Sequence, residues 1–359
     1  MFVCRRIGSR ARRLPGTERV TLFRATGIAP CAALSSVLFL ALISPFTWAQ
    51  SEIDEVHVQP RVQQQDGGQA IAALTMFDSG AKPLRLNVDL VLVPVTIMDG
   101  MNRLVKGLDR NNFEVYEGQS PQDIRYFSSE DAPVSIGIIM DVSGSMASKI
   151  ERAREAVMEF LNTANPQDEF FMITFSDKPQ EASDFTQRVE DVQAKLLYTS
   201  PKGRTALLDA VYLGISKMRQ AQYQRKALLI ISDGGDNHSR YTEREISSLV
   251  KEADVMIYAI GIYDRQFMTL EEALGPQLLH TMSEVTGGYA FCIDNPNDLT
   301  SVAKAVGIML RNQYLLGYRP GSEARDGKWH KVKIKLKWPR KLPGAFRIYA
   351  KSGYYAPAQ

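Results

Sequence analysis

The stretch PVSIGIIMDVSGSM, residues 133–146, decides the fold. Its first half is a continuous apolar run bounded by turn signals, which is typical of a buried strand in a parallel sheet. Directly after this run, Asp141, Ser143 and Ser145 place one carboxylate and two hydroxyls at alternate positions. The apolar spacing of residues 149–164 (KIERAREAVMEFLNTA) then predicts a helix. The stretch therefore predicts a buried strand that ends in a polar loop and leads into a helix.

The same alternation continues over the next 150 residues. Further strands are predicted at 169–176, 226–232, 255–262 and 289–293, and further helices at 205–221, 243–253, 269–287 and 297–314. Strands that alternate with helices and carry unbroken apolar runs favour a parallel sheet covered on both faces. We therefore expect residues 132–312 to form an α/β domain with a doubly wound, mostly parallel sheet.

The segments on either side of this domain have the pattern of β structure. Residues 86–131 and 313–359 each contain too few strands to bury a core, so we expect them to pair as the two halves of one small β-sandwich, with the α/β domain inserted between them. Pro94 argues for an edge strand or a bulge. Residues 329–338 alternate Lys with apolar side chains, which favours an exposed sheet face or edge that resists aggregation over a surface that binds acidic polymers or membranes.

The N-terminus has the pattern of a secretory signal. Residues 1–49 combine an Arg-rich start, the uncharged run 31–46, and small residues at the positions that precede a cleavage after Ala49. The alternative is an uncleaved membrane anchor, but the run is shorter than the roughly 20 residues of a spanning helix. Residues 50–85 are polar and Gln-rich and read as a linker or mobile arm. We expect a secreted, periplasmic or cell-surface protein, in contact with a membrane only if the segment stays attached.

Removing this segment changes the charge of the protein. The segment holds seven Arg and one Glu, so the remainder carries 36 basic and 39 acidic residues and a formal charge of −3, against +3 for the full chain. The positive charge of the full chain is thus no evidence for nucleic-acid binding. We therefore expect no nucleic-acid partner.

Two further polar residues occur at positions comparable to that of Asp141. Thr205 stands at the start of a predicted helix, and Asp233 ends another buried strand. Ligand sites of open parallel sheets form outside the carboxyl ends of the strands, so we expect these residues to meet the Asp141 loop. The predicted metal site therefore comprises Asp141, Ser143, Ser145, Thr205 and Asp233.

The chemistry of these five side chains favours a hard divalent cation. All are oxygen donors, which suits Mg²⁺ best, with Mn²⁺ or Ca²⁺ as alternatives, rather than zinc or copper. Two carboxylates neutralise a divalent ion and leave it able to accept one more anionic ligand. Helix capping would explain Asp141 or Ser143 alone, but not the whole set. Asp209 reads as a packing or supporting group and His238 as incidental.

Three motifs in this order resemble a known family. DVSGSM (141–146), GRTALLDA (203–210) and SDGGDN (232–237) are similar to the metal-ion-dependent adhesion site of von Willebrand factor type A domains, over about residues 131–316. The flanking segments further resemble bacterial secreted "VWFA-related" proteins of acidobacteria. The resemblance implies that Ser143, Ser145 and Thr205 bind the metal directly and that Asp141 and Asp233 bind it directly or through water. Arg204 departs from the family, where a small residue is common.

The resemblance and the charge balance together predict a function. We expect a non-enzymatic, cation-dependent adhesion module that binds a protein, or a glycan, through a carboxylate that completes the metal shell. One alternative is a metal-dependent hydrolase, which would need a positioned general base such as Asp209 or His238. Another is a scaffold in which the metal only stabilises the fold.

Overall fold

The computed structural model describes residues 90–263, 270–321, 326–337 and 346–356. The predicted signal segment, residues 1–49, and the predicted linker, residues 50–85, lie outside the described residues. The divisions at 131/132 and 312/313 also stay predictions. Among the described residues, no helix combines the length and the apolar content that a membrane crossing requires.

A six-stranded sheet forms the centre of the α/β part. Its strand order is β10-β9-β8-β5-β6-β7, and every neighbouring pair is parallel except β6 and β7. The strands are β5 (Ser135–Asp141), β6 (Glu169–Phe175), β7 (Pro179–Thr186), β8 (Lys226–Ser232), β9 (Met256–Ile262) and β10 (Ala290–Ile293). All residues of β5 and β9 are buried, as their unbroken apolar runs predict.

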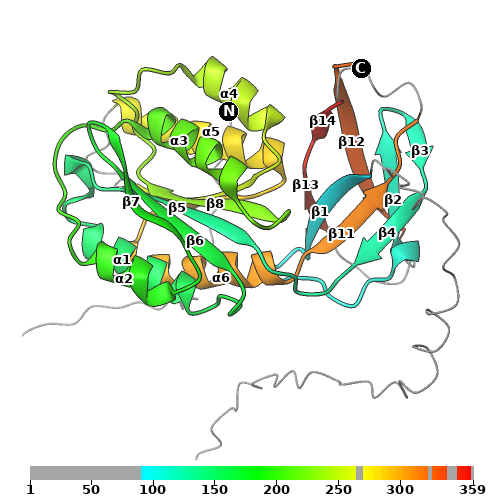
Figure 1. Cartoon of the computed structure of the whole chain (residues 1–359), viewed down its shortest axis with the longest axis horizontal. Helices are drawn as coiled ribbons and strands as arrows, with labels where there is room; N and C mark the ends of the chain where they lie inside the picture. Colours follow the sequence, from blue (N-terminus) through cyan, green and yellow to red (C-terminus); the bar gives the residue numbers. More distant parts are fainter. Residues whose placement is uncertain (1–89, 264–269, 322–325, 338–345, 357–359) are drawn as a thin grey trace, which may run out of the picture. The chain divides into compact units, whose positions relative to one another are not determined.

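Helices cover both faces of this sheet (Figure 1). They are α1 (Ile150–Leu161), α2 (Val189–Leu196), α3 (Leu207–Lys217), α4 (Glu243–Glu252), α5 (Leu270–Thr286) and α6 (Leu299–Arg311). One apolar core packs α1, α2 and α6 against the sheet, and a second packs α3, α4 and α5 against the other face. Short 3-10 helices occupy Arg110–Asn112, Gly144–Met146, Met218–Gln220 and Pro296–Asp298. The predicted doubly wound, mostly parallel α/β fold is confirmed.

Two elements of this part were missed in the sequence. The edge strand β7 is mostly polar and half-exposed, so it lacks the apolar run that identifies the other strands. It pairs antiparallel with β6 through two register shifts. Helix α2 is only eight residues long and buries Val192 and Leu196. Both elements depend on tertiary contacts rather than on a strong local pattern.

The flanking segments form two antiparallel sheets. One has the order β13-β1-β11-β4 and the other the order β14-β12-β2-β3. Their strands are β1 (Val91–Met98), β2 (Phe113–Glu117), β3 (Ser120–Gln122), β4 (Ile124–Ser128), β11 (Tyr314–Tyr318), β12 (Trp329–Leu336), β13 (Arg347–Ala350) and β14 (Gly353–Tyr355). Each sheet combines strands from before and after the α/β part, as predicted.

One apolar core lies between the two sheets. It contains residues from β1 and β11 of one sheet and from β2 and β12 of the other, which makes the pair a sandwich. Its buried members include Val93, Val95, Phe113, Val115, Leu316 and Ile334. The α/β part joins this sandwich between β4 and β11, which are themselves hydrogen-bonded neighbours, with Ser128 opposite Leu315. The inserted domain therefore occupies the place of a hairpin loop.

Pro94 does not mark an edge strand or a bulge of the sheet as a whole, but it lies where one side of its strand is unpaired. Strand β1 is internal, between β13 and β11, and Pro94 lies opposite Leu315 in a regular register. The strand tolerates proline because β13 pairs only with residues 95–98. One side of β1 is therefore unpaired at Pro94, where an N–H would have no ladder partner.

The lysines that alternate with apolar residues in 329–338 lie on an exposed face of an internal strand. In β12, Lys331, Lys333 and Lys335 are exposed while Val332 and Ile334 are buried in the sandwich core. The Lys335 ammonium lies 4.2 Å from the centroid of the Tyr116 ring on the neighbouring strand. The predicted alternation is present, although β14 and β2 flank β12 and it is not an edge.

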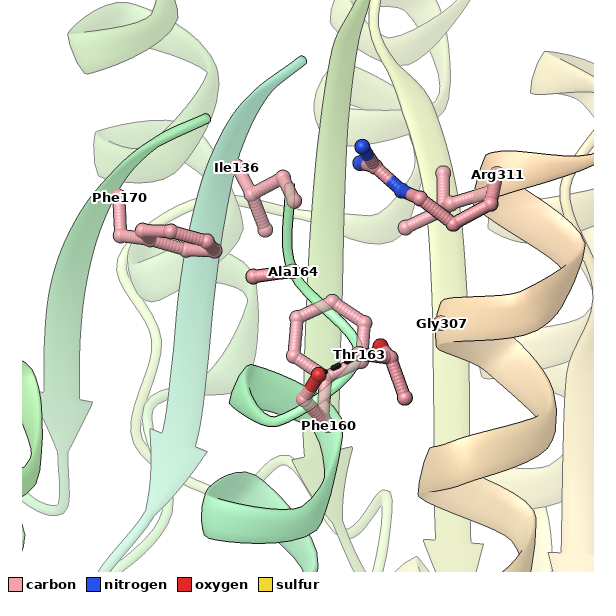
Figure 2. Close-up of a pocket in the computed structure, with 8 residues that line it drawn as sticks. Ile136, Phe160, Thr163, Ala164, Phe170, Gly307 and Arg311 are labelled. Atoms are coloured by element: carbon pink, nitrogen blue, oxygen red, sulfur yellow. Dashed lines mark hydrogen bonds between the residues drawn. The ribbon is translucent and has the colours of Figure 1, made fainter. Parts of the chain in front are cut away.

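A small apolar space lies between α1, α6 and the sheet (Figure 2). It is too narrow for a water molecule, and Phe160, Phe170 and Gly307 contribute to its lining. Thr163 faces Gly307 and donates its hydroxyl to the Phe160 carbonyl at 2.6 Å. A Cβ at position 307 would overlap the Thr163 side chain. The close packing of α6 against α1 therefore requires glycine here.

The substitution Gly307→Ala should lower the melting temperature. Overpacking of this kind costs about 1–3 kcal/mol, which outweighs the gain of up to about 1 kcal/mol in helix propensity. The double variant Thr163→Ala/Gly307→Ala should recover part of the loss in thermal unfolding. Gly321→Ala, whose Cβ would meet open space, is the control. A Gly307→Ala protein as stable as this control would contradict the packing argument.

His330 joins three elements of the sandwich. Its Nδ1 lies 2.7 Å from Glu117 Oε1 at the end of β2, and its Nε2 lies 3.0 Å from Asp326 Oδ1. Tyr354 of β14 stacks obliquely on the imidazole, with ring centroids 5.5 Å apart. The hydrogen bonds to Asp326 and Glu117 raise the pKa of His330 above its ordinary value, although partial burial opposes the rise. The imidazolium therefore stabilises the folded sandwich.

The stability of the protein should depend on pH through His330. Because the folded-state pKa is raised, the contribution is complete below about pH 6.5 and is lost as pH rises through the folded pKa. Replacing His330 by Gln should therefore lower the melting temperature more at pH 6 than at pH 9. The corresponding loss in the free energy of unfolding at pH 6 should be about 1 kcal/mol or less. His280→Gln, in the exposed pair with Glu284, should show a smaller difference. Equal pH profiles for wild type and His330→Gln would contradict the assignment.

Candidate metal site

The predicted site lies beside β5, the strand from which the chain builds the sheet first on one side and then on the other. From β5 the chain adds β6 and β7 on one side, and then β8, β9 and β10 on the other. The gap between the loops that leave β5 and β8 is therefore the switch point, where open α/β sheets bind ligands. Asp141 is the last residue of β5, and Asp233 follows the last residue of β8. These adjacent parallel strands bring the two carboxylates to one edge of the sheet.

Asp141 is fully buried and is held by two hydrogen bonds. Its Oδ1 accepts the Ser143 N–H at 2.8 Å, and its Oδ2 accepts the Ser232 hydroxyl at 2.6 Å. Burial, together with the charge of Asp233, raises the pKa of Asp141 to about 7, although the bonds from Ser143 and Ser232 oppose the rise. The two carboxylates are therefore close enough to repel each other in a desolvated place.

Asp233 is buried without hydrogen bonds. The residue is 1% exposed, and neither carboxylate oxygen has a hydrogen-bond partner among the described residues. A buried carboxylate normally accepts hydrogen bonds or coordinates a metal, because an unsatisfied charge is costly. The oxygens of Asp233 therefore have the full coordinating capacity that a cation would use.

The three predicted hydroxyl ligands lie on loops that are joined to one another. The hydroxyls of Ser143 and Ser145 are 3.1 Å apart. The Ser143 loop binds the loop before Thr205 through the Lys202 N–H to the Val142 carbonyl at 2.9 Å and the Gly144 N–H to the Gly203 carbonyl at 3.0 Å.

Thr205 in turn joins its loop to the one that carries Asp233. Its N–H donates to Asn237 Oδ1 at 3.0 Å, and its carbonyl accepts the N–H groups of Asn237 and His238. Thr205 is 4% exposed. The Asp141, Thr205 and Asp233 loops therefore form one hydrogen-bonded unit.

The donor set fits a hard divalent cation. Among the described residues, no group of three or more His, Cys, Asp or Glu side chains is placed to hold a metal. A site of two carboxylates and three hydroxyls is not such a group, since only Asp141 and Asp233 belong to those residue types. The orphaned oxygens of Asp233 beside a buried Asp141 are the observation that favours a bound cation.

Sequence reasoning missed four residues that build this site. Ser232 donates to Asp141, and Asn237 binds Thr205. Gly234 has a positive φ of 76°, and a Cβ there would lie 2.7 Å from the Gly275 Cα of α5. Lys149, at the start of α1, places its Nζ 3.6 Å from Asp233 Oδ2. Ser232, Gly234 and Asn237 lie within the motif SDGGDN, but the sequence does not show which role each of them has, and no motif contains Lys149.

Three other residues discussed in the sequence analysis, Asp209, Arg204 and His238, make contacts within the loops. Asp209 accepts the N–H groups of Arg240 and Tyr241 at 2.9 and 3.2 Å, and Arg240 Nε at 3.1 Å. Arg204, next to Thr205, places its Nη1 3.3 Å from His238 Nδ1 in an exposed contact. Asp209 therefore supports the loop after β8, as expected for a packing or supporting group.

The comparisons with known proteins agree with this geometry. Residues 136–235 match the family model described as the von Willebrand factor type A domain. This match assigns residues 136–235 to the von Willebrand factor type A domain family. The matched residues include Asp141 and Asp233, and the resemblance stated for the three motifs is confirmed at the level of the domain.

The individual relatives share little sequence identity with this chain. Inter-alpha-trypsin inhibitor heavy chain H4 from Homo sapiens is 23% identical over 146 residues, 36% of this chain and 16% of that protein. The Sus scrofa protein is 23% identical over 179 residues, 44% of this chain and 19% of that protein. The chain therefore spans less than a fifth of the length of these curated relatives.

Among solved structures, a von Willebrand factor type A protein from Catenulispora acidiphila is similar with a TM-score of 0.44 and 12% identity, covering 74% of each chain. The BatB protein from Bacteroides thetaiotaomicron is similar with a TM-score of 0.40 and 18% identity, covering 49% of this chain and 97% of that one.

Replacing Asp209 by Ala should destabilise the type A domain. Two backbone N–H groups in a partly buried loop would lose their acceptor, which costs about 1–3 kcal/mol. We expect the melting temperature, measured in EDTA to exclude effects of metal, to fall by several degrees. Asp254→Ala, which removes an exposed carboxylate that pairs with Lys351 at 2.8 Å, should change it little. Equal shifts in the two variants would refute the supporting role of Asp209.

Proposed function

We propose that this protein is an extracytoplasmic binding module whose type A domain holds a divalent cation and captures a partner through it. Asp141, Ser143, Ser145, Thr205 and Asp233 would hold the cation. One acidic side chain of a protein ligand, Asp or Glu, would complete the coordination. The observation that carries the proposal is that both oxygens of buried Asp233 lack a hydrogen-bond partner within the described part of the chain, beside the equally buried Asp141.

The charge of the site explains why it would bind a partner rather than only a metal. Asp141 and Asp233 contribute two negative charges, and the three hydroxyls contribute dipoles without charge. A divalent cation held by such a set is neutralised but not over-neutralised, in contrast to a calcium loop with three or four carboxylates. It therefore keeps affinity for one further anionic ligand.

The chemistry of the donors supports Mg²⁺ as the first choice of cation. Hydroxyl and carboxylate oxygens are hard ligands, and Mg²⁺ commonly combines one or two carboxylates with other oxygen donors. Mn²⁺ shares this preference and offers a convenient probe, and Ca²⁺ is the remaining alternative. When bound, the cation supplies the electrophile that the partner's carboxylate meets.

The contacts around the site favour binding over hydrolysis. Water activation by a metal commonly works with a positioned general base. The carboxylate of Asp209 is occupied by the N–H groups of Arg240 and Tyr241, and His238 faces the Arg204 guanidinium. The two residues considered for that role are thus engaged in the loop structure. We therefore propose a non-enzymatic module for a protein partner, with a glycan as the alternative.

The location outside the cytoplasm is proposed from residues 1–49. Their basic start, apolar run and small residues before position 50 have the pattern of a secretory signal. A secreted, periplasmic or cell-surface protein meets millimolar divalent cations and exposed partners, which suits a metal-completed binding site.

Replacing Asp233 by Asn should abolish metal binding. The substitution keeps the size of the side chain but removes one of the two charges that balance the cation, so we expect at least a hundred-fold rise in the Kd for Mn²⁺ by isothermal titration calorimetry. The control is Asp254→Asn, which removes a carboxylate that lies next to Val255, at the opposite end of the sheet. This variant should bind Mn²⁺ as wild type does.

Partner capture provides the second arm of this experiment. The wild-type protein, immobilised with Mg²⁺, should retain surface proteins that EDTA releases, and Asp233→Asn should not retain them. Undiminished Mn²⁺ binding by Asp233→Asn would refute the metal site. Retention that survives EDTA would refute the proposed mode of binding.

A further inference from the structure

A buried lysine reaches into the proposed metal site. Lys149 is the residue before α1, and it is only 7% exposed. Its ammonium donates to the Ile262 carbonyl at the end of β9, at 3.3 Å, and lies 3.6 Å from Asp233 Oδ2. The side chain thus extends from the loop that contains Ser143 and Ser145 to the ends of the strands beyond it.

The burial of this charge requires compensation. A lysine is almost never fully buried unless it is paired, because an ammonium loses its hydration. Among the described residues, Asp233 is the one carboxylate within 4.0 Å of the Lys149 ammonium. Asp141 adds a second negative charge nearby, since its charge and that of Asp233 act on each other. The site thus places a buried ammonium 3.6 Å from one buried carboxylate, which in turn interacts with a second.

The geometry leaves the coordinating atoms of Asp233 available. A distance of 3.6 Å is too long for a hydrogen bond, and both oxygens of Asp233 remain without one among the described residues. An ammonium that had been placed to satisfy Asp233 would lie about 2.7–2.9 Å away. Lys149 therefore acts on the carboxylate through its charge and does not occupy the position of a ligand.

We infer that Lys149 is a fixed positive charge of the proposed metal site, which partly balances Asp141 and Asp233 without metal and makes the metal-loaded site cationic. This inference rests on the proposed function. With a divalent ion in place, two carboxylates and one ammonium leave a formal charge of +1. Lys149 thereby weakens the affinity for the metal and strengthens the affinity of the loaded site for an anionic partner group.

The charge also explains how two carboxylates can stay buried before a metal arrives. Like charges at neighbouring strand ends destabilise the fold unless a counter-charge is present. Lys149 supplies this counter-charge from within the chain. The same ammonium repels an incoming divalent cation at short range, and such repulsion is strong where water is excluded.

The substitution Lys149→Met tests the inference, since methionine keeps the length of the side chain and removes the charge. In EDTA, Lys149→Met should have a lower melting temperature than wild type. In isothermal titration calorimetry, its Kd for Mn²⁺ should be at least about ten-fold lower than that of wild type. With saturating Mn²⁺, it should bind trifluoroacetate, followed by fluorine NMR relaxation, at least about three-fold more weakly.

Two controls separate charge from packing. Lys149→Arg keeps the charge, so its Kd for Mn²⁺ should stay within about three-fold of wild type. Lys226→Met removes another partly buried lysine that donates to a backbone carbonyl, that of Met218 at 2.9 Å, but at the amino end of β8. It should leave the Kd for Mn²⁺ and the binding of trifluoroacetate unchanged.

The outcomes distinguish this inference from the proposed function. Binding of Mn²⁺ by wild type with an unchanged or higher Kd in Lys149→Met would overturn the inference alone. Binding by neither protein would overturn both. Binding by Lys149→Met but not by wild type would overturn the proposed function, since the native protein would then hold no cation, and with it the inference about the metal-loaded site.

Discussion

The repulsion between two buried carboxylates is the main electrostatic constraint on the α/β domain. Asp141 and Asp233 end adjacent parallel strands, and burial together with the charge of Asp233 raises the pKa of Asp141 to about 7. No apolar core gains from such an arrangement, since each desolvated charge opposes folding. The surrounding structure counters it with hydrogen bonds from Ser143 and Ser232, and with the Lys149 ammonium. A cation bound between the carboxylates would remove the remaining repulsion.

The rest of the domain fixes these charges in place. The sheet sets the separation of the two strand ends, and backbone hydrogen bonds link the Val142, Lys202, Thr205 and Asn237 loops. On the second face, the loop after Asp233 touches the backbone of α5 at Gly234 and Gly275, where neither position has room for a Cβ. Loops supported from both sides in this way are preorganised, so a bound cation would not have to order them.

Much of this architecture could be read from the sequence because its signals are local. Unbroken apolar runs identified β5, β8 and β9, and two of the three motifs located the ends of β5 and β8. The missed features depend on partners that are distant in the chain. Strand β7 is polar and exists through its pairing with β6, and Pro94 is tolerated because β13 stops beside it. The burial of Lys149 was not predictable, since lysine is normally exposed and its counter-charge comes from residue 233.

The pairing of β4 with β11 has a consequence for the order in which the protein folds. These two strands are hydrogen-bonded neighbours, yet residues 129–313 separate them in the chain. Closing so long a flexible loop costs about 3 kcal/mol more entropy than closing a hairpin turn. A folded α/β domain removes this cost, because Arg225 binds the Ala132 and Leu310 carbonyls and so holds the incoming and outgoing chain together. The inserted domain would then fold first. Its two chain ends would hold β4 and β11 close together, so that the sandwich could form.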